Sequence, residues 1–108
     1  MSSWFVYNAG QTIGSVGAEG GEILRDEVHK GGVRVTLKRG SKYISVSCKV
    51  YGWMDHTRFF SSVTEAQREY LLMKPSLAHM VENISTTSGS DLNLKMWEAI
   101  AEFVRRFP

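Results

Sequence analysis

The chain has 108 residues, of which 43% are hydrophobic and 22% charged, a composition typical of one globular domain. This balance argues against a disordered chain and against a membrane protein. The net charge of +2 permits a polyanionic partner but does not require one, because nucleic-acid-binding domains usually concentrate more positive charge. We therefore expect a single domain spanning residues 1–108.

Cysteine usage and hydropathy favour a cytoplasmic protein without a membrane partner. Cys48 is the only cysteine, so an intramolecular disulfide is impossible and a cysteine-based metal site would lack its other sulfur ligands. The N-terminal MSSWFVYN does not resemble a signal peptide. No segment approaches the ~20 apolar residues of a membrane span.

The first twenty residues predict a short strand followed by a loop. Residues 4–7 (WFVY) are aromatic and β-branched, which suits a strand. Five glycines between positions 10 and 21 then predict a mobile loop rather than a helix. This loop is not a phosphate loop, because it has neither Gly-Lys-Ser/Thr opening a helix nor the glycine spacing of a dinucleotide site. A connector, or a flap over a groove, is the favoured interpretation.

The central third of the chain predicts an antiparallel meander. Residues 22–29 form a polar strand, and Gly31-Gly32 marks a turn before residues 33–38, in which apolar and polar residues alternate. After the reversal at residues 39–42, a second alternating strand over residues 44–50 directs its apolar positions to one face. Those apolar positions are Ile44, Val46, Cys48 and Val50.

The stretch YGWMDHTRFF, residues 51–60, raises the question of catalysis. If residues 53–60 form a strand, Asp55 and His56 point to opposite faces and are not partners. If residues 52–55 form a turn instead, the Asp-His step is structural. Catalysis also needs several converging groups, and no nucleophile stands in a recognisable elbow. We predict no catalytic residues here.

The C-terminal part changes to helical periodicity. Ser62 to Glu65 has the spacing of a capping box, and apolar residues then recur every three to four positions to residue 84. Pro75 predicts either a kink or two short helices. Residues 85–90 form a loop before a last helix over residues 91–107. The expected stripe of that helix comprises Leu94, Trp97, Ile100, Ala101, Val104 and Phe107.

Together these elements predict an α+β fold. It consists of an antiparallel β-meander of about four or five strands, over residues 22–60 with or without residues 4–7, followed by two C-terminal helices packed on one sheet face. The helices are expected over residues 63–84 and 91–107. No metal site is predicted, because His29, His56 and His79 lie in different elements without ligand spacing, and no cofactor is expected.

Three functions are compatible with this fold. Our first hypothesis is a small non-enzymatic protein-interaction module that self-associates as a homodimer. Its contacts would use the polar sheet face or the outer side of the Trp97 helix, or the open strand over residues 4–7. The alternative of single-stranded nucleic-acid binding would use a basic, tyrosine-bearing sheet face, but the low net charge disfavours it. A small-ligand pocket between sheet and helices is the third. The nucleic-acid hypothesis uses Arg34, Lys38, Tyr43, Lys49 and Tyr51, and the pocket hypothesis uses Trp53, Phe59, Tyr70 and Trp97.

Overall fold

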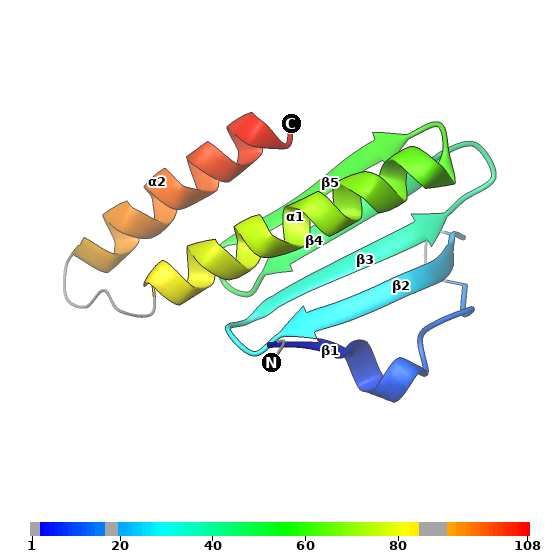
Figure 1. Cartoon of the computed structure of the whole chain (residues 1–108), viewed down its shortest axis with the longest axis horizontal. Helices are drawn as coiled ribbons and strands as arrows, with labels where there is room; N and C mark the ends of the chain where they lie inside the picture. The colour runs from blue at the N-terminus through cyan, green and yellow to red at the C-terminus, as the bar shows by residue number, and fades with distance from the viewer. Residues whose placement is uncertain (1–2, 17–19, 85–90) are drawn as a thin grey trace.

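A five-stranded antiparallel sheet followed by two helices makes up the chain, which confirms the predicted α+β fold (Figure 1). The structure is a computed structural model that describes residues 3–16, 20–84 and 91–108. The strands follow one another across the sheet in chain order, as a meander does. The elements are β1 (Trp4–Val6), the 3-10 turn η1 (Tyr7–Gly10), β2 (Glu22–His29), β3 (Val33–Arg39), β4 (Ile44–Val50), β5 (Met54–Phe60), α1 (Val63–Ile84) and α2 (Asp91–Arg106).

Alternation along β3 and β4 gives the sheet two different faces. Val35 lies opposite Cys48, and Thr36 lies opposite Ser47, so apolar residues meet on one face and hydroxyl residues on the other. The apolar face is fully buried beneath the helices, with Val35 and Cys48 both at 0% exposure. We call the opposite face, which neither α1 nor α2 covers, the open face (Figure 1).

The long helix α1 supplies most of the cover for the sheet. It begins at a cap in which the backbone N–H of Glu65 donates to the Ser62 hydroxyl at 3.1 Å. Tyr70, Met73 and Leu77 then point into the core and are fully buried. The helix continues through Pro75 as one element, so the alternative of two short helices is wrong. Pro75 and Leu71 both lie on the exposed side, where water can satisfy the carbonyl that loses its proline donor.

The second helix, α2, runs beside α1 at the β5 side of the sheet (Figure 1). Its buried residues are Met96, Ile100 and Phe103, followed by Phe107 just after the helix. The predicted stripe is only partly covered, because Ile100 and Phe107 are buried whereas Ala101 is exposed and Leu94 and Trp97 are 59% and 55% exposed. The apolar surface of α2 covers roughly half the helix circumference at 100° per residue, which is wider than one packing contact can bury.

The glycine-rich segment is tied to β2 over the part that the structure describes. The Thr12 hydroxyl donates to Asp26, the Gly14 N–H donates to the Ile23 carbonyl, and Val16 bridges to Glu22. Residues 11–16 form no regular helix or strand, as predicted. Residues 17–19 of this loop and the predicted loop at residues 85–90 lie outside the described residues. None of the helices described is long and apolar enough to cross a bilayer.

Candidate functional site

Asp55 and His56 lie on strand β5 and point to opposite faces of the sheet. The turn occupies residues 51–53, where Gly52 has a φ of 84°, and β5 starts at Met54. Asp55 lies opposite Lys49 on the open face. His56 lies on the helix side, where its Nε2 donates to the Phe107 carbonyl at 2.7 Å. The two side chains therefore form no acid-base pair, and His56 holds the end of the α2 segment against the sheet.

The remaining histidines are engaged in separate structural contacts. His29 is buried, its Nδ1 accepts from the Gly31 N–H at 2.8 Å, and its Nε2 donates to Glu82 at 3.1 Å. Both nitrogens of this ring are thus occupied, which leaves no free lone pair for a substrate proton. His79 is paired with Asn83 on the surface of α1. Among the described residues no three metal-ligating side chains come together.

Cys48 lies in the core of the sheet and is a poor nucleophile. It is completely buried between β3 and β5 on the helix side of β4. Burial raises the pKa of the Cys48 thiol to about 12, and the nearby negative charge of Asp55 acts in the same direction. Because the thiolate is the reactive form, this thiol behaves as a small hydrophobic side chain.

Asp26, on β2, is the centre of a closed hydrogen-bond cluster on the open face. Arg34 donates to its two carboxylate oxygens at 2.9 and 2.6 Å, and the Thr36 and Thr12 hydroxyls donate at 3.1 and 2.8 Å. Burial alone would raise the pKa of Asp26, but the bonds from Arg34 and Thr12 and the charge of Arg34 outweigh it and lower that pKa. The Arg34 guanidinium also stacks on the Tyr7 ring at 3.7 Å. Arg34, predicted to bind nucleic acid, is therefore engaged within the fold.

The other part of the open face, over β4, β5 and the Lys38 end of β3, is more accessible. Lys38 lies beside Ser45 in the register, and Lys49 beside Arg34. Neither lysine side chain forms a hydrogen bond or an ion pair with the described residues. These lysines border a shallow hollow of about 390 Å³. The remaining predicted residues lie at its ends, with Tyr43 packed edge-on against Phe59 at 6.2 Å and the Lys49 ammonium 5.7 Å from the Tyr51 ring.

The four residues of the predicted ligand pocket lie in three different places. Trp53 and Trp97 meet edge-on, with ring centroids 5.5 Å apart. Tyr70, on α1, is buried against the sheet and donates to Glu27 at 2.7 Å, while burial, reinforced by this bond, raises its pKa. Phe59 is on the open face and 67% exposed. These residues therefore do not line one cavity between sheet and helices.

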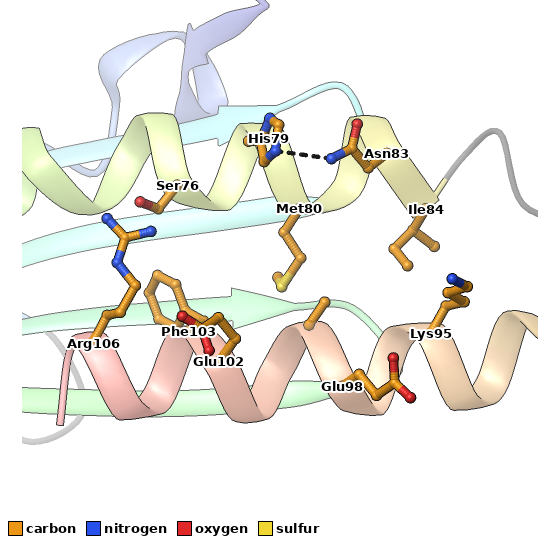
Figure 2. Close-up of a pocket in the computed structure, with 11 residues that line it drawn as sticks. Ser76, His79, Met80, Asn83, Ile84, Lys95, Glu98, Glu102, Phe103 and Arg106 are labelled. Atoms are coloured by element: carbon orange, nitrogen blue, oxygen red, sulfur yellow. Dashed lines mark hydrogen bonds between the residues drawn. The ribbon is translucent and has the colours of Figure 1, made fainter.

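Trp53 does line a hollow of about 350 Å³ between the β4–β5 turn and the two helices, without the other three predicted residues. A further hollow against the helices is a groove between α1 and α2 that the sequence did not reveal (Figure 2). It has a volume of about 510 Å³. Met80 and Phe103 form its apolar floor, and Lys95, Glu98 and Arg106 stand along the α2 wall. These walls carry both signs of charge and no convergent set of polar groups, so they select no particular ligand. No sequence pattern could have located this groove, because it depends on how the two helices are placed.

The most distinctive surface is the side of α2 that faces away from the core. Leu94, Trp97, Ala101 and Val104 recur there with spacings of three and four residues, and we call this set the outer stripe. Val104 is half-buried and joins the stripe to the core, whereas Leu94 and Trp97 are exposed. Trp53 extends the apolar surface toward the β4–β5 turn. Of the described elements, none lies on the far side of α2 from α1 (Figure 1).

Searches of protein-family models, curated proteins and solved structures found no match for this chain.

Proposed function

We propose that the chain is a small, non-enzymatic protein-interaction module that self-associates through the outer stripe of α2. The observation that carries this proposal is the pair of apolar faces on one helix, of which only one is covered. A helix that packs on a single surface needs one stripe, whereas α2 leaves Leu94 and Trp97 in solvent beside a fully buried set. Large exposed apolar side chains that form a contiguous surface are typical of protein interfaces, and tryptophan is enriched among their energetic anchors.

Other features support the same proposal. The edge strand β1, considered from the sequence as a dimer contact, has only three residues and offers few free backbone groups. His29, His56 and Cys48 are engaged or buried, which argues against their use as a catalytic base or nucleophile. A buried free thiol needs no oxidising compartment, so we propose the cytoplasm as the location.

The oligomeric state in solution tests this proposal. Sedimentation equilibrium of the full chain should show a dimer that dissociates on dilution. Leu94→Glu should raise the dissociation constant by about 100-fold, because it would bury an unpaired carboxylate in the interface. The matched control is Leu71→Glu on α1, where the leucine is 51% exposed compared with 59% at Leu94.

The control variant should dimerise like the wild type, and circular dichroism should show both variants folded. A wild-type chain that stays monomeric at high micromolar concentration would contradict the proposal. Equal losses of dimer affinity in the two variants would show that the interface lies outside the outer stripe.

A further inference from the structure

The outer stripe is complementary to itself when the helix is reversed. In an antiparallel pair of α2 helices centred near Ala99, Leu94 of one copy faces Val104 of the other. Trp97 likewise faces Ala101, so the largest side chain meets the smallest. The three- and four-residue spacings match the seam of a two-stranded coiled coil. A parallel pair would instead place Trp97 against Trp97 and Ala101 against Ala101, which leaves one layer crowded and the next empty.

The charges beside the stripe select the same direction. Asp91, Glu98 and Arg105 follow one another every seven residues, on the side of the stripe away from the core. Asp91 lies in the first turn of α2 and Arg105 in the last. Reversal of the second helix brings Asp91 of each copy beside Arg105 of the other, so symmetry provides two ion pairs. A parallel pair would place the two copies of each residue on opposite sides of the seam, so Asp91 and Arg105 would not meet.

Both of these end residues are free to reach across. Asp91 is exposed. Arg105 contacts Glu102 one turn earlier, yet its side chain keeps 75% of its surface exposed. Glu98 would face its own counterpart near the axis, so it is the one unfavourable position of the arrangement.

We infer that two copies of this chain pair through their α2 helices, antiparallel about a two-fold axis near Ala99, with Asp91 of each copy bound to Arg105 of the other. This inference rests on the proposed function and specifies its partner and geometry. Trp97 and Trp53 form the centre of the interface in each copy, since their rings already contact one another. The outer stripe lies on a different side of α2 from the groove between α1 and α2, and Glu98 borders both the groove and the dimer axis.

A charge-swap experiment on the full chain tests the pairing. Arg105→Glu and Asp91→Lys should each raise the dimer dissociation constant by about 10-fold, because each change replaces two attractions with two repulsions. The double variant should return to within about 3-fold of the wild type. Each substitution is also unfavourable for the α2 macrodipole. If the substitutions acted only by destabilising the helix, the double variant would therefore form the weakest dimer of the three variants. The matched control is Lys95→Glu, an exposed charge reversal away from the stripe.

A distance measurement provides an independent test. Nitroxide labels at Glu98→Cys should lie close together in the dimer, whereas labels at Arg106→Cys should lie roughly 20 Å further apart along the helix axes. Cys48 is buried and stays unlabelled. Equal distances at the two positions, or a double variant weaker than either single variant, would overturn the antiparallel pairing. The Leu94→Glu result reports separately whether the outer stripe is the interface at all.

Discussion

On the half of the open face formed by β2 and β3, Asp26 and Arg34 are held in hydrogen bonds, whereas over β4 and β5 Asp55 and Lys49 lie opposite each other without an ion pair. The two halves carry the same kinds of residues. They differ in burial, since Asp26 is 1% exposed and Asp55 is exposed to water. A buried carboxylate must be bonded within the protein, while a solvated one need not be.

This difference teaches which charges maintain the fold and which remain available. The helix side of the sheet follows the buried pattern, because Glu27 accepts from both Tyr70 and Lys74 and joins β2 to α1. Arg58 similarly joins β5 to Glu69 on α1. Lys38, Lys49 and Asp55 have no such partners within the described residues. Substitutions on the two halves of the open face should therefore have very different consequences.

The largest difference is expected between Asp26→Ala and Asp55→Ala. Removal of Asp26 leaves Arg34 and two threonine hydroxyls without their acceptor, so the free energy of unfolding should fall by about 2–4 kcal/mol. The same substitution at Asp55 should change it by less than about 0.5 kcal/mol. Urea denaturation followed by circular dichroism measures both values. Similar losses at the two positions would show that the Asp26 cluster is no more important than a solvated charge.

Acid should act on the Asp26 cluster and on the Glu27 contacts, with a smaller effect. The pKa values of Asp26 and Glu27 are lowered in the fold, despite burial, by their hydrogen bonds and neighbouring cations. A lowered folded-state pKa adds stability that is complete above the unfolded value, near 4, and is lost as the pH falls below it. Unfolding free energies measured from pH 7 to pH 3 should therefore decline mainly below about pH 4.

The decline should be shallower in Asp26→Asn and in Glu27→Gln, because each variant has lost one of the linked groups. The two variants serve as controls for each other, since their clusters lie on opposite sides of β2. Profiles parallel to that of the wild type in both variants would contradict this assignment.

The strands and their faces were predictable from the sequence because the alternation of apolar and polar residues that defines them lies within each strand. Val35 and Thr36, like Cys48 and Ser47, alternate with the period of two that a half-buried strand requires. The same alternation correctly placed Asp55 and His56 on opposite faces once β5 proved to be a strand. Pro75 could not be settled in this way, because tolerance of a proline depends on the exposure of the carbonyl that it leaves unbonded.

The candidate site was less predictable because it depends on placement in space. The bulge between Ile23 and Arg25 shifts the parity of β2, so alternation alone does not assign Asp26 to the open face or identify Arg34 as its partner. From the sequence, the apolar residues of α2 were predicted to form a single broad stripe. Which part of that stripe is covered is decided by contacts with α1 and β5, and this decision is what exposes Trp97.

The smallest effects are expected from the unpaired lysines. Lys38→Ala combined with Lys49→Ala should change the unfolding free energy by less than about 0.5 kcal/mol, since neither lysine forms an ion pair with the described residues.

We also expect the wild-type chain to show no micromolar affinity for a labelled single-stranded oligonucleotide at about 150 mM salt. Asp26 neutralises Arg34, and Asp55 lies opposite Lys49, so few cations remain to release counterions. Fluorescence anisotropy at low and near-physiological salt measures this affinity. Salt-sensitive micromolar binding that the double variant abolishes would make the surface around Lys38 and Lys49 a nucleic-acid surface.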